Sequence, residues 1–218
     1  MRPLILLNFK TYPEAVGKKA LLLAKKLEKV RTQKYEIVIA PSLPTLEEVA
    51  AGRSLTVYAQ HTDLAGLGAF TGKISAQELK KIGVKGTLLN HSERKIPFPI
   101  LRKIVADCKK QKLVVVVCAS SLLEAKKVAE LKPDYLAYEP PELIGGDISV
   151  TKARPDIILR AVELVKKISP KTKVLCGAGV HSREDILKAL QLGTKGVLIG
   201  HAVPKAKDPA KFLRELLR

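Results

Sequence analysis

Short aliphatic runs alternate with longer amphipathic stretches along the whole chain, and this alternation constrains the fold more than any other feature. Eight runs read as strands: Leu4–Asn8, Glu36–Ala40, Leu55–Gln60, Gly86–Asn90, Leu113–Cys118, Tyr135–Tyr138, Lys173–Cys176 and Gly196–Ile199. They are nearly continuous in apolar character, which is typical of parallel strands whose outer face is covered. The sequence therefore favours an α/β fold built on a parallel sheet.

The stretches between the runs predict helices, the longest over Glu14–Val30, Pro97–Gln111 and Pro155–Ile168. Capping residues mark the starts of five further helices, at Thr45 (with Glu48), Ser75 (with Glu78), Ser121 (with Glu124), Ser182 and Asp208. Eight strand–helix units with short loops close naturally into a (β/α)8 barrel, which we expect to form a single domain over residues 1–218. An open, doubly wound sheet is the structural alternative, although it requires no particular strand count.

The chain is strongly basic, with 39 Lys and Arg against 21 Asp and Glu, and a net charge of +18. Such a field attracts nucleic acid or small anions. Because the lysines are spread over helix faces and no aromatic-studded basic tract is present, we expect a solvated basic surface and no nucleic-acid partner. The Lys-rich composition, with no Trp and two Asn, also fits a thermostable protein.

The apolar runs and the cysteines of the sequence indicate the cellular compartment of the protein. No run approaches the ~20 residues that span a membrane, so we expect no membrane partner. The N-terminus has no signal-peptide layout, and the protein is predicted to be cytoplasmic. Cys108, Cys118 and Cys176 form no CxxC pair, so free buried thiols are expected and no metal site is predicted.

Polar residues follow the strand runs, at the end of the barrel where active sites of this fold lie. They are Asn8, Lys10, Gln60, His61, Asn90, His91, Ser92, Glu93, Glu139, Gly177–Gly179, Gly200 and His201. Taken singly, each of these residues could have a purely structural role, as a surface lysine, a helix cap or part of a tight turn. Together they supply a base, a neutral histidine, a cation and two glycine loops whose N–H groups can bind phosphate.

The stretch Tyr138–Gly146 has the layout of a lid. Glu139 ends a strand, two prolines follow at once, and a glycine pair stands at the other end. Prolines prevent the strand from continuing, whereas glycines permit movement. A carboxylate at the start of such a lid is shielded from water when the lid closes. This desolvation raises its pKa and makes it a better base. A surface turn that carries an acidic residue is the alternative.

These residues resemble the triosephosphate isomerase family, and the similarity runs over essentially the whole chain. It is carried by Asn8-Phe9-Lys10, Gly68-Ala69-Phe70-Thr71-Gly72, Asn90-His91-Ser92-Glu93, Tyr138-Glu139-Pro140, Ile144-Gly145 and Gly196-Val197-Leu198, in this order. The resemblance implies a TIM barrel. The compact length is similar to that of the archaeal branch, which implies a homotetramer. Thr71 matches a threonine that in the family reaches into the neighbouring subunit's site.

The resemblance also implies an activity and a set of roles. The enzyme would interconvert dihydroxyacetone phosphate and D-glyceraldehyde 3-phosphate through an enediolate, in glycolysis and gluconeogenesis, without a cofactor. Glu139 would be the base, His91 a neutral hydrogen-bond donor, and Lys10 a positive charge beside the oxyanion. Glu93 would support Lys10 and His91. The substrate-binding residues implied are Asn8, Phe9, Lys10, Ile144, Gly145, Gly179, Gly200 and His201.

The chain departs from the family pattern at three places. The lid reads Ile144-Gly145-Gly146-Asp147 instead of Ile-Gly-Thr-Gly, the last glycine loop contains His201, and His61 follows the third strand. These departures concern substrate affinity and turnover more than the reaction. The alternatives are another phosphate-binding barrel enzyme, such as a sugar-phosphate epimerase, a non-catalytic barrel that binds anions or nucleic acid, and an isomerase disabled by these changes.

Overall fold

Eight parallel strands form a closed barrel in the computed structural model, which describes residues 2–52, 54–140 and 155–218. Each strand pairs with its neighbours in sequence, and the first also pairs with the last, so that the ring closes. The strands are β1 (Leu4–Asn8), β2 (Glu36–Ala40), β3 (Thr56–Ala59), β4 (Gly86–Leu89), β5 (Val114–Ala119), β6 (Tyr135–Tyr138), β7 (Lys173–Cys176) and β8 (Gly196–Ile199). The predicted (β/α)8 TIM barrel is confirmed.

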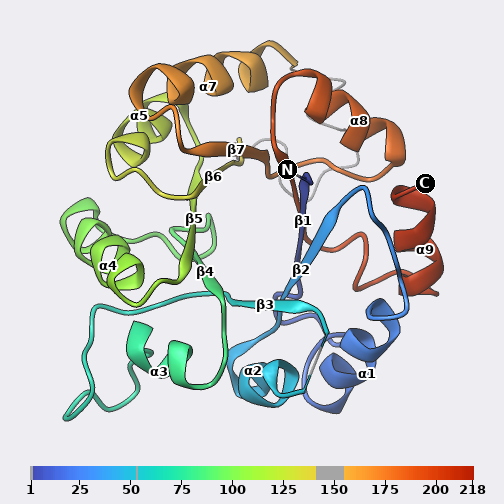
Figure 1. Ribbon diagram of the computed structural model, residues 1–218, viewed down its shortest axis with the longest axis horizontal. Coiled ribbons are helices and arrows are strands. Elements are labelled where there is room, and N and C mark those ends of the chain that lie inside the picture. The colour runs from blue at the N-terminus through green and yellow to red at the C-terminus, as the bar shows by residue number, and fades with distance from the viewer. Residues whose placement is uncertain (1, 53, 141–154) are drawn as a thin grey trace.

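Helices surround the barrel as an outer ring (Figure 1). Within the described ranges they are α1 (Lys18–Leu27), α2 (Leu43–Ala50), α3 (Ala76–Lys81), α4 (Phe98–Lys110), α5 (Leu122–Glu130), α7 (Pro155–Ile168), α8 (Arg183–Gln191) and α9 (Pro209–Leu216). None of these helices has the length and apolar character needed to cross a membrane.

The core has two layers because successive strand residues point to opposite faces. On β1, Leu4 and Leu6 belong to a cluster inside the barrel, whereas Ile5 and Leu7 belong to the larger cluster between the strands and the helices. All four side chains are at most 1% exposed. Burial on both faces explains why the strands read as continuous apolar runs in the sequence.

The junction where the barrel closes depends on one glycine. Gly196, the first residue of β8, has φ of +141°, and a Cβ placed on it would lie 2.0 Å from the carbonyl oxygen of Leu4. A side chain at this position would therefore separate β8 from β1. Glycine is the residue that permits both the backbone angle and the close approach.

Two predicted helix starts are wrong. Helix α1 begins at Lys18 instead of Glu14, because Gly17 has φ of +55° and interrupts the helical backbone. Helix α2 begins at Leu43 with Ser42 as its N-cap, so Thr45 lies inside the helix. Pro44 fixes this start, since proline is accommodated in the first helical turn.

The other predicted caps are confirmed by hydrogen bonds to backbone N–H groups. Ser75, Ser121, Ser182 and Asp208 each accept a hydrogen bond from the residue three positions later. The three cysteines are buried and free, as expected.

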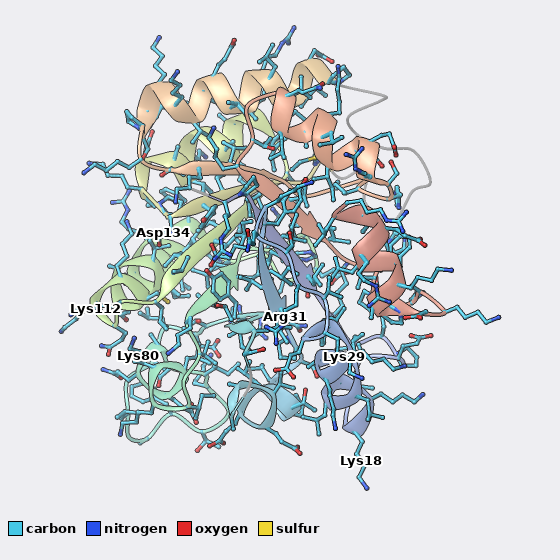
Figure 2. All side chains as sticks on the ribbon, turned by 45° about the vertical axis from the view of Figure 1, so that its right-hand side comes forward. Lys18, Lys29, Arg31, Lys80, Lys112 and Asp134 are labelled. Atoms are coloured by element: carbon cyan, nitrogen blue, oxygen red, sulfur yellow. The ribbon has the colours of Figure 1, made fainter. Side chains whose placement is uncertain are left out.

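The lysines are distributed as the sequence predicts. Lys18 and Lys112 extend into solvent from different sides of the molecule (Figure 2). The positive charge is therefore spread over the outer helices and their connections.

Candidate active site

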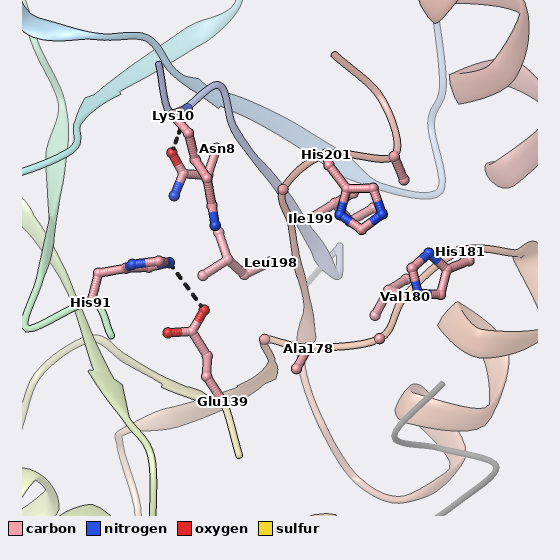
Figure 3. Close-up of a pocket in the computed structure, with 14 residues that line it drawn as sticks. Asn8, Lys10, His91, Glu139, Ala178, Val180, His181, Leu198, Ile199 and His201 are labelled. Atoms are coloured by element: carbon pink, nitrogen blue, oxygen red, sulfur yellow. Dashed lines mark hydrogen bonds and ion pairs between the residues drawn. The ribbon is translucent and has the colours of Figure 1, made fainter. Parts of the chain in front are cut away.

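The carboxyl ends of five strands surround one pocket (Figure 3). The lining residues are Asn8, Lys10, His91, Glu139, Gly177, Ala178, Gly179, Val180, His181, Leu198, Ile199, Gly200, His201 and Ala202. The structure thus brings together the glycines of both predicted loops and five of the polar residues predicted at the strand ends, which are Asn8, Lys10, His91, Glu139 and His201.

Glu139 follows β6 directly, and its N–H group still donates to the carbonyl oxygen of Ala119 on β5, at 2.8 Å. Its side chain is 4% exposed, and Oε1 lies 3.5 Å from Nε2 of His91. Among the described residues, Oε2 has no hydrogen-bond partner. Burial raises the pKa of Glu139 to about 7. A carboxylate with this pKa can take up a proton at neutral pH.

His91 is held as a neutral imidazole with a defined tautomer. Its Nδ1 accepts a hydrogen bond from the backbone N–H of Glu93 at 3.2 Å, so Nδ1 carries no proton. The proton of the neutral ring is therefore on Nε2, which faces Glu139 (Figure 3). Burial, followed by the nearby Lys10 ammonium group, lowers the pKa of His91 to about 4. At neutral pH the ring is an uncharged hydrogen-bond donor.

Lys10 lies in a tight turn after β1, with φ of +48°. Its N–H donates to Oδ1 of Asn8 at 3.0 Å, and its carbonyl oxygen accepts from Nε2 of Gln60 at 3.2 Å. The ammonium group points into the pocket (Figure 3). It also forms an ion pair with Oε1 of Glu93 at 2.6 Å. Oε2 of Glu93 lies 3.7 Å from Nδ1 of His91, so this carboxylate is adjacent to both groups.

Gly177 makes room for the carboxylate of Glu139. A Cβ at Gly177 would lie 2.4 Å from Cγ of Glu139, which is too short for any non-bonded contact. The sequence predicts that Gly177-Ala178-Gly179 is a phosphate loop or a tight turn. It does not predict that Gly177 also makes room for the side chain of Glu139. The close approach is a tertiary contact between β6 and β7 and has no local signal.

The opposite end of the pocket is formed by the loops after β7 and β8. Gly179 (φ of +62°), Gly200 and His201 line it, as predicted. His181 also lines it and was missed. The rings of His181 and His201 have centroids 5.4 Å apart (Figure 3). The only available signal was the position of His181 two residues after Gly179.

Phe9 and His61 are predicted site residues that do not line this pocket. The side chain of Phe9 is fully buried in the core between strands and helices. His61 contacts Asp63 at 3.3 Å and lines a separate opening beside Lys10 and Glu93. Ile144 and Gly145 lie outside the described residues, as do the other residues of the predicted lid from 141 onward.

The sequence matches known proteins over nearly its whole length. A family model described as "Triosephosphate isomerase" matches residues 3–216. A triosephosphate isomerase of Methanothermus fervidus is 43% identical over 218 residues, covering 99% of this chain and 98% of the relative. Those of Methanosarcina mazei and Methanocaldococcus jannaschii are each 42% identical, over 217 residues (99% of this chain, 98% of the relative) and 216 residues (99% of each). The pocket geometry and these matches lead to one conclusion: the chain belongs to the triosephosphate isomerase family.

Proposed function

We propose that the pocket interconverts dihydroxyacetone phosphate and D-glyceraldehyde 3-phosphate by proton transfer, with Glu139 as the base. The observation that carries this proposal is the pairing of a buried carboxylate, whose pKa is raised to about 7, with a neutral imidazole that points its Nε2–H at the same space. This pair can remove a proton from carbon and stabilise the oxyanion that results.

The steps follow from these positions. The Glu139 carboxylate takes a proton from the carbon next to the substrate carbonyl, and the electron pair moves to the carbonyl oxygen to form an enediolate. His91 donates its Nε2–H hydrogen bond to that oxygen, and the Lys10 ammonium group adds positive charge beside it. Through His91, the hydroxyl proton on the first carbon moves to the former carbonyl oxygen. Glu139 then returns its proton to the former carbonyl carbon, so that the first carbon becomes the aldehyde and the ketose is converted to the aldose.

Phosphate binding is assigned to the loops after β7 and β8. Gly179, Gly200 and His201 line this end of the pocket, and glycines have no side chain that would keep a phosphate away from the backbone. Ile144 and Gly145 are proposed as further contacts of the phosphate.

Asn8 has a positioning role in this scheme, because its side chain accepts a hydrogen bond from the N–H of Lys10. No cofactor or metal is required, since proton transfer and charge stabilisation are supplied by side chains.

The chain is also proposed to form a homotetramer. Leu64, Leu67 and Phe70 are 38%, 56% and 47% exposed in the loop between β3 and α3. Such a group of exposed apolar side chains favours burial against a second subunit. Size-exclusion chromatography with light scattering gives the molar mass directly, and a monomer at micromolar concentration would refute the assembly. A cytoplasmic location and thermostability remain predictions.

The reaction is tested with a coupled assay of glyceraldehyde 3-phosphate conversion on the wild type, Glu139→Gln and His91→Gln. Removal of the base should lower kcat by roughly 10²–10⁴-fold. Circular dichroism of each variant is the control for folding. Equal turnover by the wild type and a folded Glu139→Gln variant would show that Glu139 is not the base.

A further inference from the structure

A second polar cluster lies behind His91, and the reaction proposed above does not use it. It consists of Asn90, Lys95, Ser120 and Glu124. Asn90 and Lys95 lie in the loop after β4, Ser120 follows β5, and Glu124 lies in the first turn of α5. Glu124 is at its centre. Asn90 is buried, whereas the side chains of Lys95 and Glu124 are 41% and 26% exposed.

The carboxylate of Glu124 accepts five hydrogen bonds. Oε1 accepts from Nδ2 of Asn90 at 2.7 Å and from Nζ of Lys95 at 2.9 Å. Oε2 accepts from Nζ of Lys95 at 2.8 Å, and from the N–H and the hydroxyl of Ser120 at 2.7 Å each. Although burial opposes ionisation, the bonds from Lys95 and Ser120 hold the pKa of Glu124 at about 2. The group is therefore a fixed anion at neutral pH.

The position of Glu124 in the sequence suggested a different use. Ser121 and Glu124 have capping-box spacing, in which the glutamate would bond back to the serine N–H. Only half of this motif forms, with the hydroxyl of Ser121 accepting from the N–H of Glu124 at 3.1 Å. The carboxylate instead accepts from the N–H of Ser120 and from the side chain of Asn90, which directly follows β4.

Asn90 is the residue that this contact immobilises. Its φ of +58° lies in the left-handed region, which is unusual for a residue other than glycine. Its Nδ2 donates to the carbonyl oxygen of Cys118 at 2.9 Å as well as to Glu124, and its Oδ1 accepts from the N–H of Ile96 at 3.0 Å. The side-chain amide is thus bonded on both sides of the turn.

His91 follows Asn90 directly, so the direction of its ring depends on this turn. The N–H group that bonds to its Nδ1 comes from Glu93, in the same short segment between Asn90 and Ile96. A change in the turn would therefore alter both the ring position and the contact that defines the tautomer.

We propose that Glu124 is a positioning residue for His91 and acts by holding the left-handed turn at Asn90. The inference rests on the role proposed for His91 in the reaction. Glu124 itself is absent from the residues that line the pocket, so it acts through Asn90 without touching the substrate. It also neutralises Lys95, whose ammonium group is close enough to lower the pKa values of both His91 and Glu139.

Glu124→Ala separates this role from general stability. Because a misplacement of about 1 Å can lower a rate by up to about 10²-fold, we expect kcat to fall roughly 10- to 100-fold. We expect KM to change little, because the phosphate loops on β7 and β8 are not touched. The acid limb of the kcat profile should move to lower pH, because the unpaired Lys95 ammonium group then favours the ionised form of Glu139.

Three further variants complete the design. In Glu124→Ala with Lys95→Met, the pH shift should disappear while the loss of kcat remains. Glu124→Gln keeps an acceptor for Asn90 and should recover part of kcat. Asp208→Ala removes the N-cap of α9 instead, which should lower Tm and leave kcat unchanged.

The NMR signal of the His91 Nε2–H group gives a readout that does not depend on catalysis. We expect one sharp, slowly exchanging signal in the wild type and a broadened one in Glu124→Ala. If Glu124→Ala does not fold, Asn90→Gly serves instead, because glycine keeps the positive φ while both side-chain contacts are lost. Unchanged kcat, pH profile and imidazole signal would overturn the inference. Loss of the imidazole signal, with no effect of His91→Gln on kcat, would instead overturn the proposed reaction.

Discussion

Burial of Glu139 makes the folded chain less stable at alkaline pH than a variant without this charge. Its carboxylate is 4% exposed, and Oε2 is without a hydrogen-bond partner in the described part of the chain. Glu139→Gln removes the charge and keeps the shape. We therefore predict that this substitution removes the base and, at pH 8, stabilises the fold.

The magnitude follows from the difference between two pKa values. The pKa of Glu139 is about 7 in the folded protein and 4.5 in an exposed glutamate, a difference of about 2.5. At about 1.36 kcal/mol for each pKa unit, this corresponds to about 3 kcal/mol. Below pH 4.5 both states bind the proton and no stability is lost. Between pH 4.5 and 7 the unfolded state loses its proton first, so stability falls with rising pH, and above pH 7 the loss is complete.

The assay compares thermal unfolding of the wild type and Glu139→Gln at pH 4 and pH 8. The burial of the glutamine amide contributes equally at both values, so the change in the Tm difference reports only the ionisation. With a shift of roughly 2–4 °C per kcal/mol for a chain of this size, the Tm difference should grow by roughly 6–12 °C in favour of the variant. Glu163→Gln, at an exposed position on α7, is the matched control for the change in net charge. An identical Tm difference at pH 4 and pH 8 would refute the reasoning.

Three other predictions concern the pocket and its supports. Gly177→Ala should lower kcat by roughly 10²-fold or more in the coupled assay, because its methyl group would displace Glu139, and a loss of less than about threefold would contradict this. His201→Ser should leave activity at pH 8 unchanged or raised, and a large loss would show that the imidazole is required. Ser182→Ala removes the capping box with Asp185 and should lower the unfolding free energy by about 1 kcal/mol in urea, with an unchanged m-value.

The strand order and the position of the site could be predicted from the sequence, because both depend on local patterns. A strand that is buried on both faces, such as β5, reads as an aliphatic run wherever it occurs. Barrel closure then places the residues after each strand on one rim, so Lys10, His91 and Glu139 meet although they are far apart in the sequence. The expected rise in the pKa of Glu139 is also confirmed.

Features that depend on contacts between elements could not be predicted. The same three-residue spacing closes a complete capping box at Ser182 but only half of one at Ser121, because Asn90, which follows β4, competes for Glu124. The close approach of Gly177 to Glu139 likewise involves two adjacent strands. These contacts become visible only when the barrel is complete.

The pairing of β1 with β8 also has a consequence for synthesis of the chain on the ribosome. Leu4 of β1 lies beside Gly196 of β8. Because β1 is the first of the eight strands to be synthesised and β8 the last, β1 lacks one of its two neighbours until β8 has been translated. Contacts with so large a sequence separation form late in folding. Lys10, which extends from the end of β1, therefore cannot be held in its final place in a nascent chain that lacks β8. A ribosome-bound fragment that ends before Gly196 would have an exposed β1 edge and no isomerase activity.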